Sequence, residues 1–573
     1  MNPWARILRS VLPFLLTIVL VYAGTTQAAN AAPNNQTGFL IIAADRGFLG
    51  NEEIRDAFEP FSANHPAALV FVTDERTQQT LKSGLDSLRH QGVERIVVLP
   101  LFISAAEPRY RLVHQLLTQE KGNTPPVFAR PYGESYFAVE ALADRFHMME
   151  QTTDQHLLVI GYGTTDDASK QAMHKDWARI VKQASHGFDF RSTHTLVLPE
   201  RGTDEDGEHY ATRVTQQLTD SWKSLKPVVK GGQNQVITFA LGPKHDSMMS
   251  LEARLEWLLP ENATLNNFQV KPQQLTMWMA REANRNLPLV AEDTGVIIFA
   301  HGSDFHWNEN LRIAVRPLMD RYKVEFAFSM ADPITIERAL RKLEQRDAKA
   351  VVIVSAYATS TSFRTDIERL VGLDIEDQSV QHSANGHGGH DGHGHHGKSS
   401  KPSPRILTSL PVVWTGGYED NPLFANALLD RALAVSKDPT KETVILVAHG
   451  ARDDQRNETW LQKLENIVNH MRSNGGEKFK AIQVATWRED WPEKRAPWIE
   501  KVRTMVTEAN KQGGKAIVIP ARTTATGPEK KFLAGLEFEL GEGFAPHPLF
   551  TQWVDEQIQQ GMKQHATAIS HSK

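Results

Sequence analysis

The sequence predicts an α/β protein made of four small modules, each built on a parallel sheet. Three observations support this fold class. The chain has 573 residues, which is too long for one ordinary domain. An apolar run that ends in a short turn and precedes a helical pattern occurs four times. The turn residues Asp45, Tyr162, His301 and His449 lie 117, 139 and 148 residues apart, a spacing typical of small domains.

The first strand of each module is predicted from a continuous apolar run, which is typical of parallel strands buried on both faces. These runs cover residues 38–47, 156–163, 295–303 and 443–450. A second apolar strand follows later in each module, at residues 95–102, 235–240, 350–355 and 516–520. Because helical patterns lie between the runs, the sequence predicts βαβ crossovers.

The helix after the first strand opens with the same pair of residues in three modules. The pairs are Asn51-Glu52, Asn308-Glu309 and Asn457-Glu458, and the second module has no such pair. We expect module boundaries at residues 36–150, 153–288, 292–437 and 440–566, with the second module divergent.

Composition narrows the classes of function. Hydrophobic residues make up 40% and charged residues 23%, which is typical of a soluble globular chain. Lys and Arg total 63 against 68 Asp and Glu, so the basic excess typical of nucleic-acid binding is missing, and we expect no nucleic-acid partner. There is no cysteine, so a bound metal must use His, carboxylate or main-chain oxygen ligands.

Residues 1–31 are predicted to be a signal peptide. Arg6 and Arg9 precede a largely apolar stretch of 13 residues at 11–23, and small residues follow it. Thirteen residues fall short of the ~20 that span a bilayer, so we expect cleavage rather than an uncleaved anchor, and no stable membrane span afterwards. The mature protein is then periplasmic or secreted.

The turn after the first strand is the expected position of the chemistry, since open α/β sheets bind ligands beyond the carboxyl ends of their strands. His301 and His449 occupy this turn in the third and fourth modules. An imidazole there coordinates a divalent metal or accepts a proton; the alternative is a capping or hydrogen-bonding residue of the turn. Gly302 and Ser303 keep the backbone close and leave room for a flat ligand.

A family resemblance supports the functional interpretation. The segments 300–304 (Ala-His-Gly-Ser-Asp), 308–309, 330–340 and 350–354 resemble the class II tetrapyrrole chelatases, and are most similar to the sirohydrochlorin cobaltochelatases. The first module shares this layout through residues 99–106, and the fourth shares it through residues 448–450.

The resemblance implies two bilobal pairs of flavodoxin-like lobes, the first module with the second and the third with the fourth. It implies a tetrapyrrole substrate and a divalent metal, cobalt first, with nickel, iron or zinc as alternatives. His301 and His449 become candidate metal ligands and proton acceptors, and Glu309 a candidate for assisting proton removal. The alternative for Glu309 and Glu458 is a solvated acid favoured by the helix dipole.

Departures from the family pattern concern both histidine positions. Asp45 and Tyr162 replace the turn histidine in the first two modules. The later loop that carries the family's second histidine has Glu107-Pro108 in the first module, and only the second module offers a histidine there, His245. Asp45 is either an oxygen ligand or a helix cap.

A Gly-, Ser- and His-rich insertion at 379–403 interrupts the third module and has too few apolar residues to form a core. Its closely spaced imidazoles predict divalent-metal binding. The insertion either delivers metal, stores metal, or is a tolerated insertion without a role, and the sequence leaves these three alternatives open. The six histidines are His382, His387, His390, His393, His395 and His396.

The leading hypothesis is therefore an exported chelatase that inserts a divalent metal into a sirohydrochlorin-type tetrapyrrole. The first alternative is a periplasmic tetrapyrrole- or metal-binding protein without catalysis. The second is a divalent-metal buffer based on the His-rich insertion.

Overall fold

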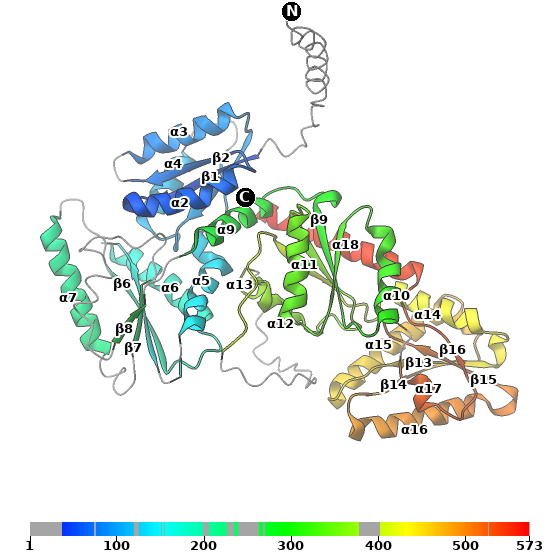
Figure 1. Cartoon of the computed structure of the whole chain (residues 1–573). Coiled ribbons are helices and arrows are strands. Elements are labelled where there is room, and N and C mark those ends of the chain that lie inside the picture. The colour runs from blue at the N-terminus through cyan, green and yellow to red at the C-terminus, as the bar shows by residue number, and fades with distance from the viewer. Residues whose placement is uncertain are drawn as a thin grey trace, which may run out of the picture.

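The computed structural model describes twelve stretches of the chain, which together contain four parallel sheets (Figure 1). The described residues are 37–73, 76–119, 125–149, 152–153, 155–164, 166–198, 205–225, 234–238, 263–266, 270–376, 401–524 and 527–571. The predicted signal peptide, His245 and the six histidines of the insertion lie outside these residues.

The first two modules contain the strands β1 to β8. The first consists of β1 (Thr37–Ala44), α2 (Gly47–Ser62), β2 (Ala67–Val72), α3 (Thr77–His90), β3 (Arg95–Leu101), α4 (Pro108–Thr118), β4 (Val127–Phe128) and α5 (Tyr136–Met148). The second consists of β5 (His156–Tyr162), α6 (Asp167–Ala184), β6 (Ser192–Leu198), α7 (Gly207–Leu225), β7 (Asn234–Thr238), β8 (Ala263–Asn266) and α9 (Pro272–Arg285).

The last two modules contain the strands β9 to β16. The third consists of β9 (Thr294–Ala300), α10 (Phe305–Val315), β10 (Lys323–Phe328), α11 (Pro333–Gln345), β11 (Ala350–Ser355), α12 (Arg364–Leu370), α13 (Leu373–Glu376), β12 (Val412–Gly416) and α14 (Pro422–Val435). The fourth consists of β13 (Glu442–Ala448), α15 (Asp454–Ser473), β14 (Ala481–Thr486), α16 (Pro492–Ala509), β15 (Lys515–Pro520), α17 (Glu529–Phe532), β16 (Glu539–Leu540) and α18 (Pro548–His571).

All four sheets have the same strand order. It runs β2-β1-β3-β4 in the first module and repeats as β6-β5-β7-β8, β10-β9-β11-β12 and β14-β13-β15-β16. Every described strand pair is parallel. This is the doubly wound order of flavodoxin-like sheets, so the predicted fold class is confirmed.

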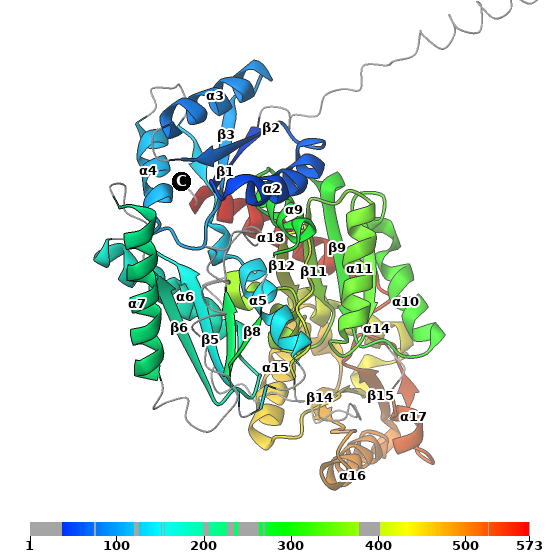
Figure 2. The same cartoon turned by 60° about the vertical axis from the view of Figure 1, so that its left-hand side comes forward.

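The modules form two pairs. Within each pair, the last helix of one module packs against the other module. Helix α5 of the first module packs on α6 of the second, and α9 returns from the second module to pack on α2 (Figure 2). In the other pair, α14 packs on α15, and α18 returns to β11 and β12. One hydrophobic core accordingly joins the first two modules, and another joins the last two.

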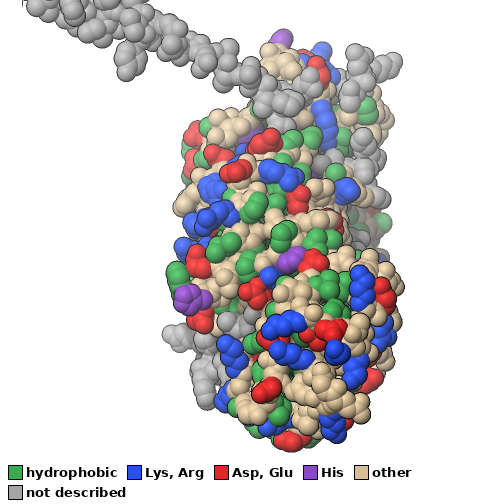
Figure 3. Space-filling model, turned by 90° about the vertical axis from the view of Figure 1, so that its right-hand side faces the viewer, with side chains coloured by type: hydrophobic (Ala, Val, Ile, Leu, Met, Phe, Trp, Pro, Cys, Tyr) green, Lys and Arg blue, Asp and Glu red, His purple; other side chains and the backbone are tan. Residues whose placement is uncertain are grey.

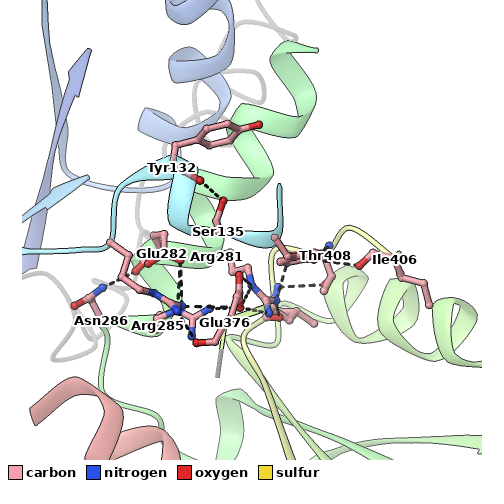
Figure 4. A network of polar contacts seen from close by, with 12 residues as sticks. Tyr132, Ser135, Arg281, Glu282, Arg285, Asn286, Glu376, Ile406 and Thr408 are labelled. Atoms are coloured by element: carbon pink, nitrogen blue, oxygen red, sulfur yellow. Dashed lines mark hydrogen bonds and ion pairs between the residues drawn. The ribbon is translucent and has the colours of Figure 1, made fainter. Parts of the chain in front are cut away.

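A buried ionic network fastens the first pair to the third module (Figure 4). Glu376, at the end of α13, has a side chain that is 1% exposed, and its carboxylate lies 2.8 Å from the guanidinium of Arg281 and 2.5 Å from that of Arg285, both on α9. Arg130 of the first module donates a 2.7 Å hydrogen bond to the carbonyl oxygen of Glu376. Although burial opposes ionisation, the Arg281 and Arg285 charges hold the pKa of Glu376 below its ordinary value.

The backbone that follows the insertion is also held by side chains of the first pair. The Arg405 amide donates to Glu140 at 2.8 Å, and the Thr408 amide donates to the Tyr136 hydroxyl at 3.0 Å. Asn284 donates to the carbonyl of Ser409 at 3.1 Å. Backbone groups of the third module thus form their hydrogen bonds with side chains of the first two modules. The two pairs of modules are therefore in direct contact through buried polar groups.

Among the described helices, none combines the length and the apolar character needed to cross a bilayer.

Candidate functional site

The carboxyl end of β9 presents His301 at the surface of the third module. All seven residues of β9 are buried, and the chain then turns at Gly302 with a φ of 72°. A Cβ atom at Gly302 would lie 2.6 Å from the Cβ of Phe328, the last residue of β10. Glycine is therefore required by both the backbone conformation and the close approach of the neighbouring strand.

Two polar side chains fix the turn. Asp304 caps α10 by accepting a hydrogen bond from the Trp307 amide at 2.9 Å. Asn308 accepts from the Ser303 amide at 3.1 Å, so it ties the helix to the turn. The same tie occurs at Asn51 with the Arg46 amide, at 3.0 Å, and at Asn457 with the Ala451 amide, at 3.1 Å. The Asn of the repeated Asn-Glu pair thus has a defined role as a clamp.

The imidazole of His301 is exposed, and its Nδ1 lies 2.5 Å from the carbonyl oxygen of Gly302. A carbonyl oxygen only accepts hydrogen bonds, so Nδ1 carries the hydrogen. In the neutral ring, Nε2 then has the lone pair that binds a metal or accepts a proton.

His449 has the same Nδ1 contact, with the carbonyl of Gly450 at 2.9 Å, but a different environment at Nε2. Nε2 lies 3.0 Å from Asp490 and 3.4 Å from Glu489. Trp460 stacks against the ring, and Trp491 meets it edge-on. Although burial opposes protonation, the hydrogen bond to Asp490 and the charge of Glu489 raise the pKa of His449 above its ordinary value.

The loop after β14 supplies the two carboxylates that face His449. Arg488 has a φ of 51° and is 5% exposed, and it donates to the carbonyl of Ala451 at 2.7 Å. Glu489 is held in turn by Arg522, whose Nη2 lies 3.2 Å from Oε2. Glu489 is therefore fixed by a largely buried arginine, whereas the side chain of Asp490 is 50% exposed.

Glu309 and Glu458 are accessible to solvent, but the expected first-turn position is wrong: the first turn of α10 has no acid, and that of α15 has only Asp454. Glu309 forms an ion pair with Arg312 at 3.3 Å, three residues along α10, and its side chain is 35% exposed. Glu458 is exposed on α15. The described contacts of Glu309 do not include His301, so its catalytic role stays a prediction.

In the first module, both residues at the histidine positions brace their own turns. Asp45 accepts from the Gly47 amide at 3.0 Å and from Asn51 Nδ2 at 2.7 Å. Glu107 accepts from the amides of Ile103 and Ser104, at 2.9 and 3.1 Å. Of Tyr162, at the same place in the second module, the structure describes the backbone alone.

Those predicted site residues that the structure describes are not brought together in one metal centre. No described contact joins His301 to His449, and the described stretches contain no group of three or more His, Asp or Glu side chains arranged to hold a metal ion. On the face seen in Figure 3, acidic and basic side chains are interspersed with apolar ones.

Sequence reasoning missed Glu489 and Asp490. The available signal was their place directly beyond the apolar segment that forms β14, whose carboxyl end adjoins that of β13. Without the pairing of these strands, nothing in the sequence associated the acids with His449.

Comparisons with known proteins support the family. The CbiX family model matches residues 48–148. The sirohydrochlorin cobaltochelatase of Saccharolobus islandicus is 33% identical over 91 residues, which cover 15% of this chain and 71% of that protein. The corresponding enzyme of Saccharolobus solfataricus is 32% identical over 91 residues with the same coverage.

Similarity to solved structures is weaker. A multi-domain protein of Deinococcus radiodurans, described as structurally similar to chelatases, has 18% identity and a TM-score of 0.30 and covers 47% of this chain and 54% of its own. A myo-inositol-binding protein of Caulobacter has 12% identity and a TM-score of 0.24, with 44% and 88% covered.

Paired, doubly wound modules with an imidazole at the carboxyl edge define a protein of the chelatase class. The chain belongs to the class II chelatase family, of the CbiX type. The family model matches the first module, whose turn carries Asp45, whereas the turn histidines lie in the third and fourth.

Proposed function

We propose that this protein is a chelatase that inserts a divalent metal, cobalt first, into a sirohydrochlorin-type tetrapyrrole, and that the third module carries the chemistry. The observation that carries this proposal is the His301 turn. Its imidazole is exposed at the carboxyl edge, and its Nδ1 is committed to Gly302, which leaves Nε2 for the reaction.

The chemistry requires a group of this kind. Insertion exchanges two pyrrole protons for one divalent ion, so the protein must present the ion and remove protons. Nε2 of His301 does either task in turn, since one lone pair binds the metal or the proton but not both together. The edge around it is partly apolar, because Phe305 is 72%, Met330 48% and Ile334 75% exposed. Such side chains suit the face of a flat conjugated ring.

His449 is suited to a different task from His301. Its Nε2 already faces two carboxylates, so a metal would have to displace the hydrogen bond to Asp490. We therefore propose His301 as the main metal-handling residue and keep a metal-ligand role for His449 as a secondary prediction.

The direct test mixes the purified full chain with sirohydrochlorin and cobalt and follows the tetrapyrrole absorption spectrum. The proposal predicts insertion faster than in buffer by at least ~100-fold, the usual scale of acid–base assistance. A rate equal to that of buffer would refute it.

A second candidate function is tetrapyrrole binding without catalysis. The observation that favours it is the loss of metal-handling groups: Asp45 and Glu107 brace turns, and His449 is paired with acids. Tight, saturable tetrapyrrole binding without turnover would select this function over the first.

The remaining parts of the proposal concern segments outside the described residues. We propose that the His-rich insertion binds divalent metal and that the protein is exported after cleavage of residues 1–31. Deleting residues 379–400 should remove most nickel or cobalt bound per chain in equilibrium dialysis. N-terminal sequencing of protein from the periplasmic fraction should start near residue 29 or 32, and recovery of intact Met1 would contradict export with cleavage.

A further inference from the structure

The segment that links the two pairs of modules, residues 286–293, is held from both sides. Arg95 of β3 donates a 2.8 Å hydrogen bond to the carbonyl of Asn286. His565 of α18 is 3% exposed, and its Nε2 lies 3.3 Å from the carbonyl oxygen of Leu287. Because a carbonyl oxygen only accepts hydrogen bonds, Nε2 carries the hydrogen. The last helix of the fourth module thus reaches α9 of the second module (Figure 2).

A second imidazole lies where the first module meets the third. His65 follows α2, and its ring stacks on that of Phe61 with 4.5 Å between the centroids. Its Nδ1 lies 3.1 Å from the carbonyl oxygen of Phe61. Lys349, directly before β11 of the third module, is close enough to act on this ring electrostatically. The junction between the two pairs therefore contains two imidazoles, each in contact with a carbonyl oxygen.

Each imidazole also faces a cation of another module. Arg285 of α9 acts on His565, and Lys349 acts on His65. Burial lowers the pKa of both imidazoles below the ordinary value, and the two cations lower it further, although the carbonyl contacts act in the opposite direction. Both rings are therefore neutral in the closed junction at neutral pH.

The other charges at the junction do not compensate a proton on either ring. The nearest charged residues along α2 and α18, Glu59 and Lys563, are exposed to solvent. Arg285 belongs to the buried ionic network (Figure 4), whose three arginines and two acids are Arg130, Arg281, Arg285, Glu282 and Glu376. Because this network is already net positive, a proton on His565 adds a further buried positive charge beside it.

We propose that the junction between the two pairs is an acid-sensitive switch, in which protonation of His65 and His565 releases α18 from α9 and separates the first module from the third. In the closed junction each proton would occupy a buried position facing a cation, whereas in the open junction it is solvated. Protons therefore bind the open form more tightly. The stabilisation of the closed form is complete above the ordinary histidine pKa of about 6.5 and decreases as the pH falls below it.

The test follows the distance between the two pairs in the full chain as the pH changes. Since the chain has no cysteine, Gln79→Cys on α3 and Arg338→Cys on α11, both at exposed positions, provide a unique pair of spin labels. We expect one short distance at pH 7.5 and a longer one at pH 5.0, with the far-UV circular dichroism unchanged. The ratio of open to closed chains should change by up to about 100-fold per pH unit, because two protons are taken up. An unchanged distance, or loss of the helical signal together with the opening, would overturn the proposal.

Neutral replacements of the two rings distinguish this switch from general acid sensitivity. The amide of His65→Asn replaces the Nδ1 donor and that of His565→Gln replaces the Nε2 donor, but neither amide takes up a proton. The double variant should stay closed at pH 5.0, and each single variant should keep a change of about tenfold per pH unit. The control His90→Gln, at an exposed position of α3, should open as wild type does. A double variant that opens at the same pH as wild type would contradict the switch.

NMR titration of the wild-type imidazoles keeps the proposal testable if a variant does not fold. The signals of His65 and His565 should titrate below pH 6.5, over the range in which the distance changes. Titration of both rings at or above pH 6.5 would overturn the proposal. Lys349→Met removes the cation that faces His65, so it should raise the pKa of His65 and move the opening to lower pH. An opening at unchanged pH in this variant would refute the role of the facing cation.

Discussion

His301 and His449 show how one turn gives two chemically different imidazoles. In both, Nδ1 faces the carbonyl of the following glycine. The difference lies in the loop after the neighbouring strand, which supplies Glu489 and Asp490 to His449. The sequence motif around each histidine therefore does not determine its protonation, because the decisive groups come from elsewhere in the chain.

The substitution Asp490→Asn tests this difference. The raised pKa means that protonated His449 stabilises the fold below its ordinary pKa, and that this contribution is lost as the pH rises through the folded value. Removing the Asp490 charge should lower the pKa of His449, measured by NMR titration of its imidazole. Asp86→Asn, at an exposed ion pair with Arg89, is the control and should leave it unchanged. An unshifted pKa in Asp490→Asn would contradict the assignment.

Gly302→Ala tests the close approach of the turn to β10. Both Gly302 and Gly92 have a positive φ, but nothing lies within 4 Å of a Cβ at Gly92. Gly92→Ala should therefore cost only the left-handed strain of about 1–2 kcal/mol. Gly302→Ala should cost more in the free energy of unfolding, measured with urea, since the methyl also meets Phe328. An equal loss of unfolding free energy in the two variants would show that β10 shifts away from the added methyl group at no cost.

At the scale of elements, the central strands were predictable, whereas the edge strands and the packing partners of the helices were not. The eight apolar runs correspond to the first and third strands of each module in chain order, which are the two central strands of each sheet: β1, β5, β9 and β13 with β3, β7, β11 and β15. A continuous apolar run specifies burial on both faces, which only a central parallel strand satisfies. The amphipathic pattern of a helix shows that one face is buried but not which sheet covers it, so the exchange of α9 and α18 was not foreseen.

The same limit applies to the candidate site. The His301 turn was predictable because its residues are contiguous in sequence. The carboxylates at His449 were not, because they become neighbours only when β13 and β14 pair.

Trp278→Ala tests the exchange of α9. Trp278 is fully buried in the core shared by the first two modules. Its ring packs edge-on against that of Tyr132, with 5.4 Å between the ring centroids. Its truncation should cost about 3–5 kcal/mol and lower hydrogen-exchange protection in β1 and β5 together. Trp498→Ala, at a partly buried residue of α16, should leave both strands protected. Loss of protection confined to β5 would mean that the two modules are stabilised separately.

At the scale of the whole molecule, the ionic network around Glu376 joins the first pair of modules to the second pair. The first pair is predicted to lack metal chemistry, and the second is predicted to perform it. Glu376 lies three residues before the His-rich insertion, and Arg405 lies two residues after it. The described residues on each side of the insertion, Glu376 and Arg405, are therefore joined to the first pair through buried charges.

Glu376→Gln should destabilise the junction strongly, because it leaves buried arginines without their anion. Breaking a buried ion pair costs about 3–5 kcal/mol. The lowered pKa of Glu376 means that its stabilisation is present above the ordinary carboxyl value and is lost as the pH falls towards the folded value. Calorimetry should show a lower melting temperature at pH 7, and a smaller further loss on acidification than in wild type. A variant with unchanged stability at both pH values would refute this account of the junction.

The central claim is that the imidazole of His301 handles the metal, and the rate of cobalt insertion into sirohydrochlorin by His301→Ala tests it most directly. The exposed side chain makes a folding defect unexpected, which circular dichroism and tetrapyrrole binding verify in the same sample. The account predicts that the variant still binds the macrocycle and that its insertion rate falls by ~100-fold or more, towards that of buffer. Insertion by His301→Ala at the wild-type rate would contradict it.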